Sequence, residues 1–196
     1  MISAELRARM LGGEMYNDLL AELVEAREQA VHRTDEYNRS FGRPPAERVE
    51  LLRRLLRGVG EGTHFEPTFR CEFGLNITVG ANFYANFDCV MLDGGSITIG
   101  DNVLLGPRVS IYTSNHAMDA EERVAGGCYA RPVSIGDNTW IGGGVTVNPG
   151  VTIGRNTVIG SGSVVTRSIP DNSLAAGVPA RVLREITAAD RTDYLP

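Results

Sequence analysis

The chain has 196 residues and carries 24 acidic against 19 basic residues, which gives a formal net charge of -5 at pH 7. This length supports one main core with a small appended unit, and the acidic balance argues against nucleic acid or a membrane as a partner, because both attract clustered positive charge. Three cysteines without C-x-x-C spacing, and no apolar stretch long enough for a signal or a bilayer span, predict a cytoplasmic protein without a disulfide framework or a zinc site.

Residues 1–60 are predicted to form a small N-terminal helical region. Apolar residues recur at helical spacing among Glu and Arg in segment 19–24, and they do so again in segment 49–56, after Pro44-Pro45. We interpret these stripes as packing faces rather than as a binding surface.

A six-residue repeat dominates residues 61–172. In its downstream half, each unit opens with an aliphatic residue that Gly follows in most units; the openers are Ile135, Ile141, Val147, Ile153, Ile159 and Val165. The same period runs upstream but slips near Gly94-Gly95, where we expect a local bulge or loop. Six residues suit short strands joined by tight turns, in which Gly or Asn takes backbone angles that other residues avoid. Because one such unit cannot bury its own apolar residue, the coils are predicted to stack into a parallel β-solenoid.

The repeat breaks at residues 112–131. Long excursions from a regular scaffold usually carry function, and this one contains His116, whereas His32 and His64 fall in or just after the helical region. On the residues alone, a single loop histidine is more often a surface residue than a base.

Residues 173–196 are expected to form a C-terminal tail.

Several runs of sequence together resemble the maltose and galactoside O-acetyltransferases, a family of hexapeptide-repeat acetyltransferases. These runs are segments 66–74, 82–89, 112–116, 136–143 and 176–181. The resemblance covers nearly the whole chain and is closest to the maltose branch. It implies a mainly β fold, namely a left-handed parallel β-helix with N-terminal helices and an extruded loop. It also implies a homotrimer that transfers acetyl from acetyl-CoA, without a metal, to a hydroxyl of a sugar such as maltose, glucose or a galactoside.

The resemblance also assigns the reacting groups. Acetyl transfer from a thioester to an alcohol needs a base for the hydroxyl proton and donors for the developing oxyanion. Histidine suits the first task because its ordinary pKa is about 6.5, so His116 is the expected general base. Asn86 is the expected oxyanion donor, although on its own it is equally consistent with a stacked turn residue. Acceptor binding is expected from Asp18, Glu72, Asn86 and Asp93, of which Asp93 is equally consistent with a turn cap.

A second set matches the family's coenzyme-binding positions. It comprises Trp140, Gly143, Ser161, Thr166, Arg167, Arg181 and Arg184. Arginine pairs well with phosphate groups, whereas small residues at the other positions also suit the repeat itself. Ala117 stands where similar enzymes have Pro, and we interpret Cys128 as a packing residue rather than a nucleophile.

Three other functions share parts of this pattern. A γ-type carbonic anhydrase has the same solenoid but needs several histidine ligands on its coils. A non-catalytic solenoid scaffold would be indifferent to the loss of His116. A related acetyltransferase would act on a non-sugar acceptor, such as an amino-acid or antibiotic hydroxyl. The helical region and segment 69–72 favour the sugar branch, with direct attack by the acceptor and no acetyl-enzyme.

Overall fold

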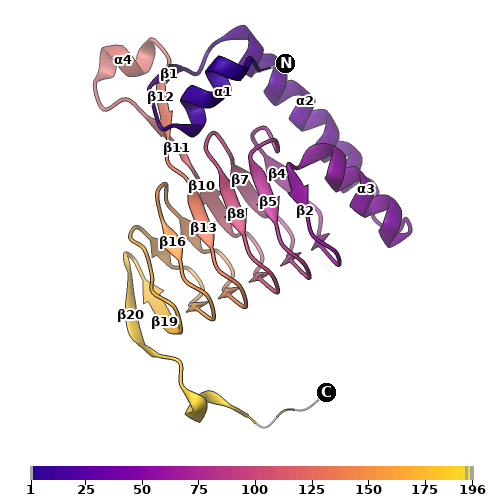
Figure 1. Ribbon diagram of the computed structural model, residues 1–196, viewed down its shortest axis with the longest axis vertical. Helices are drawn as coiled ribbons and strands as arrows, with labels where there is room; N and C mark the ends of the chain where they lie inside the picture. The colour runs from indigo at the N-terminus through magenta and orange to yellow at the C-terminus, as the bar shows by residue number, and fades with distance from the viewer. Residues whose placement is uncertain (1, 193, 195–196) are drawn as a thin grey trace.

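The computed structural model describes residues 2–192 and 194, and it is a three-sided solenoid with helices at its N-terminal end (Figure 1). Face 1 consists of β2 (Gly58–Val59), β5 (Ile77–Val79), β8 (Ile97–Ile99), β13 (Val133–Ile135) and β16 (Thr152–Ile153). Face 2 consists of β3 (His64–Phe65), β6 (Tyr84–Ala85), β9 (Leu104–Leu105), β14 (Trp140–Ile141), β17 (Val158–Ile159), β19 (Ser173–Gly177) and β20 (Ala180–Glu185). Face 3 consists of β4 (Arg70–Cys71), β7 (Val90–Leu92), β10 (Ser110–Tyr112), β15 (Thr146–Val147) and β18 (Val164–Val165).

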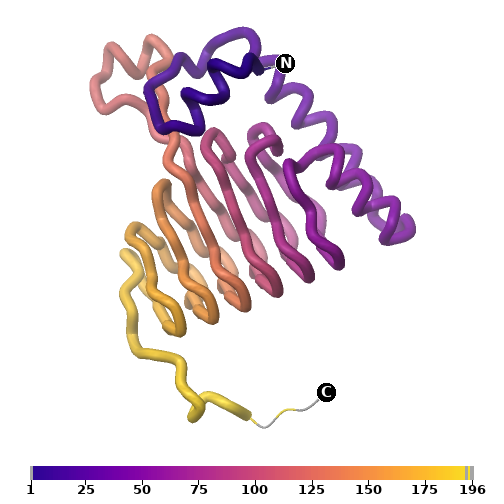
Figure 2. Tube along the Cα trace, in the orientation of Figure 1, coloured from indigo at the N-terminus to yellow at the C-terminus, as the bar shows by residue number. Residues whose placement is uncertain are grey.

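Each coil visits the three faces in turn, as the tube in Figure 2 lets the reader follow. We call the turn after face 1 the first corner, the turn after face 2 the second corner and the turn after face 3 the third corner. Equivalent strands pair in parallel: Met91 is paired with Ile111, and Ile111 with Val147 on the next coil. The predicted mainly β fold, a parallel β-helix of hexapeptide repeats with N-terminal helices and an extruded loop, is confirmed.

The opening residue of each repeat points into the solenoid, where it is buried in one continuous core. The glycine that follows is required for a reason that differs from the expected one. At Gly142, a β-carbon would lie only 2.6 Å from the backbone nitrogen of Ser161 on the next coil. These glycines therefore allow close approach between coils, and the left-handed backbone is found elsewhere.

Asparagine supplies the left-handed conformation at the first corner. Positive φ angles there belong to Gly62 in the first coil and to asparagines in the later ones, namely Asn82, Asn102, Asn138, Asn156 and Asn172. Asparagine tolerates this conformation because its short amide can form local hydrogen bonds. The side chains also bond between coils: Asn82 Nδ2 donates to Asn102 Oδ1 at 3.0 Å, and Asn102 Nδ2 donates to Asn138 Oδ1 at 3.1 Å. This ladder fixes the register of neighbouring coils.

The helices α1 (Ala4–Leu11), α2 (Ala21–Asn38) and α3 (Pro45–Leu55) form the N-terminal region, and α2 and α3 lie beside the first coil (Figure 1). Asn38 pairs with the backbone of Phe69 through two hydrogen bonds of 3.0 Å. The buried Arg48 donates to the carbonyl oxygen of Phe65 at 2.9 Å and to the hydroxyl of Tyr37 at 3.0 Å. The helices thus cover the first coil. Among the described residues, no helix is both long and apolar enough to cross a membrane.

The excursion leaves face 3 after β10 and returns to face 1 at β13. It contains β11 (Ser114–His116), the short helix α4 (Ala120–Val124) and β12 (Gly127–Ala130), and β12 pairs on its other edge with β1 (Tyr16–Asn17). At the other end of the chain, the segment expected as a tail begins with β19, which extends face 2 by pairing in parallel with β17. The strand β20 then folds back antiparallel on β19 before a single 3-10 turn, η1 (Ala188–Asp190).

Candidate active site

The three-stranded sheet of the excursion determines where His116 lies. In this sheet β12 is central, and Cys128 is paired with Tyr16 on one side and with His116 on the other. Side chains of residues directly opposite in antiparallel strands lie on the same face, so these three form one row. Asp18 follows β1 directly, and its backbone N–H donates to the Gly126 carbonyl at 2.8 Å. A carboxylate oxygen of Asp18, a ring nitrogen of His116 and the sulfur of Cys128 lie within 4.8 Å of one another.

Arg27 of α2 joins the two acids of this site that the sequence singles out. Its Nε donates to Glu72 Oε1 at 3.1 Å, and its Nη1 donates to the Asp18 carbonyl at 3.0 Å; Nη2 also bonds the Asp18 carboxylate. The guanidinium lies over the ring of Phe73, 5.2 Å from its centre. The other oxygen of Glu72 accepts from the hydroxyl of Ser114 at 3.3 Å. One arginine therefore positions both acids beside the strand that carries His116.

Burial controls the protonation of two groups in this cluster. Burial raises the pKa of Glu72 above its usual range, and the adjacent Arg27 opposes that rise. Burial likewise raises the pKa of the Cys128 thiol, whose S–H donates to the Tyr16 hydroxyl at 3.4 Å. A protonated, buried thiol is a poor nucleophile. These contacts agree with the interpretation of Cys128 as a packing residue in the protein as it stands.

Asp93 does not belong to this site. Its side chain is fully buried at the third corner, where Oδ1 accepts from the backbone N–H groups of Phe73 at 2.8 Å and Gly74 at 3.1 Å. Oδ2 accepts from the backbone N–H of Asn76 at 3.1 Å. The expectation that Asp93 binds the acceptor is corrected: its carboxylate caps a turn and has no exposed surface to offer a ligand.

Asn86 and part of the expected coenzyme set form a ladder along the second corner. Asn86 follows β6, Gly143 follows β14 and Ser161 follows β17, and these three strands occupy face 2. The Gly143 carbonyl accepts from the N–H of Gly162 on the next coil at 2.9 Å. Asn86 Oδ1 accepts from the backbone N–H of Phe87 at 2.8 Å, so its amide NH2 is the group suited to bond a ligand.

The remaining residues of the expected coenzyme set are exposed but lie in three places. Trp140 stands on face 2 with 54% of its surface exposed. Arg181 and Arg184 are on β20, and Arg184 is paired with Asp190 at 2.6 Å, a contact that lowers the pKa of Asp190 to about 2. Thr166 and Arg167 follow β18 at the third corner.

The expected catalytic pair is therefore divided between two edges of face 3. Asn86 precedes the face 3 strand of its coil, at the second corner, whereas the excursion that carries His116 leaves from the third corner. The hydrogen bond between Ser114 and Glu72 keeps β11 at that third corner. A single chain thus does not bring His116 and Asn86 to the same edge.

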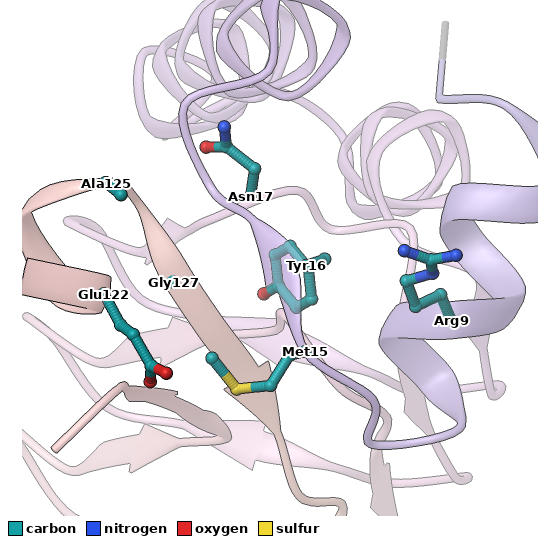
Figure 3. Close-up of a pocket in the computed structure, with 7 residues that line it drawn as sticks. All are labelled: Arg9, Met15, Tyr16, Asn17, Glu122, Ala125 and Gly127. Carbon is teal, nitrogen blue, oxygen red and sulfur yellow. The ribbon is translucent and has the colours of Figure 1, made fainter. Parts of the chain in front are cut away.

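A separate hollow of about 380 Å³ lies between α1 and the excursion (Figure 3). Its lining includes Met15, Asn17 and Gly127 from β1 and β12 and their surroundings, together with Glu122 of α4. None of the expected catalytic or coenzyme-binding residues lines this hollow, but Tyr16, which stands in the row with Cys128 and His116, does.

Known proteins match both halves of this architecture. The protein-family model "Bacterial transferase hexapeptide (six repeats)" matches residues 132–167, and the family model "Maltose acetyltransferase hexapeptide capping motif" matches residues 9–60. The galactoside O-acetyltransferase of Escherichia coli K12 is 42% identical over 186 residues, which cover 95% of this chain and 92% of that protein. The chain belongs to the maltose/galactoside O-acetyltransferase family.

Solved structures of this acetyltransferase family have the same fold. A maltose O-acetyltransferase from Clostridium difficile 630 is 47% identical and superposes with a TM-score of 0.89, over 92% of this chain and 97% of that one. A galactoside acetyltransferase in complex with coenzyme A is 41% identical, with a TM-score of 0.90, over 97% and 96% of the two chains. The enzyme is therefore an acetyltransferase of the maltose/galactoside type.

Sequence reasoning missed Arg27 and Ser114 as residues of the site. Arg27 contacts Glu72 across 45 positions of sequence, and nothing in its helical surroundings distinguishes it from Arg33, the other arginine of α2. Ser114 could have been found, because it lies two residues before His116 on the same strand and therefore shares its side of the strand.

Proposed function

We propose that the enzyme transfers the acetyl group of acetyl-CoA to a hydroxyl of a sugar-like acceptor, with His116 as the general base. The observation that carries this proposal is the cluster around His116: an exposed imidazole beside the Asp18 carboxylate, next to Glu72 and Arg27. Carboxylates and a guanidinium are suited to bond several hydroxyl groups of a sugar. The similar galactoside acetyltransferase that binds coenzyme A supports the choice of acetyl donor.

His116 would take the proton of the acceptor hydroxyl as its oxygen attacks the thioester carbonyl. The amide NH2 of Asn86 would donate to the oxyanion of the tetrahedral intermediate. When this intermediate collapses, the C–S bond breaks, and the imidazolium of His116 returns the proton to the departing thiolate of coenzyme A. The sequence of steps leaves the acetylated acceptor, free coenzyme A and a neutral histidine, so no acetyl-enzyme forms.

The active site is proposed to lie between neighbouring copies of a homotrimer. His116 and Asn86 lie at opposite edges of face 3 within one chain, so the third corner of one copy would meet the second corner of the next. Exposed apolar residues near the second corner are suited to such an interface: Trp140, Leu104 and Phe87 are 54%, 48% and 46% exposed. The coenzyme would lie along the same junction. There it would contact expected coenzyme-binding residues of both corners, Gly143 and Ser161 at the second and Thr166 and Arg167 at the third.

An acceptor panel with coenzyme A thiol release as the readout tests the reaction. We expect turnover of maltose, glucose or galactosides and a loss of roughly 100-fold to 10,000-fold in kcat for His116→Ala. His32→Ala, an exposed histidine on α2, is the matched control and should keep its rate. Turnover of only non-sugar hydroxyls would overturn the acceptor class, and an unchanged rate in His116→Ala would overturn the base.

Complementation between two inactive variants tests the shared site. His116→Ala and Asn86→Ala are each assembled alone and then unfolded and reassembled together in equal amounts. If the two residues come from neighbouring copies, random mixing restores roughly a quarter of the sites, those with an intact residue from each partner. If both residues act within one chain, the mixture stays as inactive as its components, and light scattering shows whether trimers formed.

A further inference from the structure

We propose that Asp18, His116 and Cys128 form a binding site for a thiophilic divalent cation such as Zn²⁺, and that its occupancy blocks acetyl transfer. The site is inhibitory and is not a requirement of the reaction. Only the blocking effect rests on the proposed role of His116; the binding itself rests on the geometry of the excursion.

The donor set is one that zinc prefers. A thiolate, an imidazole and a carboxylate are its usual protein ligands, and three of them with an open fourth position leave room for water. Bond lengths near 2.0–2.3 Å place ligand atoms roughly 3.3–3.8 Å apart in a tetrahedron. The three donor atoms here lie within 4.8 Å of one another. A movement of about 1 Å would therefore close the site.

The backbone already presents the ligands together. His116 and Cys128 are opposite partners on β11 and β12, and the N–H of Ala117 continues this pairing by donating to the Gly127 carbonyl at 2.9 Å. Asp18 is attached to the same sheet through its bond to Gly126. Because Cys128 is buried and His116 is exposed, we expect the small adjustment to fall on the imidazole rather than on the sulfur.

Arg27 limits how tightly the cation binds. Its guanidinium already bonds the Asp18 carboxylate and brings a positive charge next to the site. The cation must also displace the thiol proton of Cys128, which leaves for solvent as the sulfur–metal bond forms. We therefore expect weaker binding than at a closed structural zinc site, with reversal by a chelator. In the bound state the metal occupies the lone pair of His116, so the imidazole cannot accept the hydroxyl proton.

Metal titration of the full chain after chelator treatment tests the proposal. Zn²⁺ binding is followed by calorimetry and Co²⁺ binding by absorbance, because a cobalt–thiolate bond gives an intense near-ultraviolet band. Transfer rates with and without Zn²⁺ are compared within each protein. Cys128→Ser and Cys128→Ala are the test variants. The control is Cys89→Ser, since Cys89 is buried in the solenoid core, where burial raises its pKa to about 11.

The wild type should bind one Zn²⁺ per chain, show the thiolate band with Co²⁺ and lose its transfer activity as zinc is added. Cys128→Ser and Cys128→Ala should lose the band, and their zinc affinity should fall at least roughly 10-fold to 100-fold, the range that even an outer ligand partner contributes. Cys89→Ser should behave like the wild type. Equal zinc affinity in wild type and both Cys128 variants, or a wild-type cobalt spectrum without the thiolate band, overturns the site. Thiolate-bound metal with an unchanged transfer rate overturns the block, while calorimetry and absorbance remain informative if the proposed reaction itself fails.

Discussion

Replacing Asp93 with Asn separates a structural role from a binding role. The substitution preserves size, and the amide oxygen can still accept from the N–H groups of Phe73 and Gly74, as Asp93 Oδ1 does at 2.8 and 3.1 Å. In the wild type the N–H of Asn76 donates to Asp93 Oδ2 at 3.1 Å. In the variant the amide NH2 would face this N–H instead. Two donors would oppose each other in a fully buried turn.

The expected loss of folding stability in Asp93→Asn follows from these contacts. One buried hydrogen bond is lost and its donor is left unsatisfied, which costs about 1–3 kcal/mol. Removal of the buried charge offsets part of this, because burial raises the pKa of Asp93 and so penalises its ionised form. A net destabilisation of about 2 kcal/mol corresponds to a fall of roughly 4–8 °C in Tm for a chain of this size.

Thermal unfolding at one fixed protein concentration measures this difference. Glu50→Gln is the control, because Glu50 is 60% exposed and its 3.7 Å pair with Arg53 should be worth at most about 0.5 kcal/mol. Asp93→Asn should also keep the acceptor KM of the wild type at a temperature where both are folded. An unchanged Tm together with a raised acceptor KM would refute the turn-cap role and restore acceptor binding.

Three further predictions concern the site and the first corner. Arg27→Gln should reduce kcat/KM by roughly 10-fold to 100-fold through misplaced Asp18 and Glu72, measured beside the exposed control Arg53→Gln; equal rates would contradict its positioning role. Burial raises the pKa of Glu72, so the stability that its protonated form contributes to the wild type is lost as pH rises through that pKa. Glu72→Gln cannot ionise, and its stability relative to the wild type should therefore increase from about pH 4 to pH 7 in urea unfolding. A relative stability that falls over this range would refute the argument. Asn138→Ala should lose roughly 1–2 kcal/mol in urea unfolding because alanine disfavours φ 57°, and Asn138→Gly should lose less; equal losses would assign the effect to the ladder bond alone.

The regular part of the fold was predictable because its signal is local and repeated. Every opening residue between Ile135 and Val165 is buried, since a strict six-residue period leaves the chain no other way to keep its apolar residues on one side. The excursion was predictable for the complementary reason, as a break in that period. Gly142 shows the limit: its need for close approach depends on Ser161 of the next coil, and composition alone did not distinguish this from a backbone preference.

The site was less predictable because its contacts cross between distant segments. The resemblance to known enzymes drew attention to Asp18 and Glu72, whose role in acceptor binding stays a prediction. Arg27, which bonds both acids, lies in α2, and the sequence around it did not distinguish it from Arg33, the other arginine of that helix. Asp93 was misassigned where the repeat slips by two residues, because position within a repeat no longer identifies which side chain faces outward. The neighbours of Cys128, Tyr16 and His116, depend on the pairing of β1, β11 and β12, which the sequence did not predict.

The separation of His116 and Asn86 at different corners has a physical origin in the solenoid. Coils stack at the strand spacing of about 4.8 Å, and side chains on one corner form a straight ladder in which neighbours point in the same direction. Such a ladder suits a long flexible ligand, but it cannot surround a small reacting centre. Convergence requires elements that leave the repeat, which here are the excursion with His116 and the N-terminal segment with Asp18. On the proposed assembly, the missing wall would come from the second corner of the next copy, so that loss of trimer contacts would abolish activity while each chain stays folded.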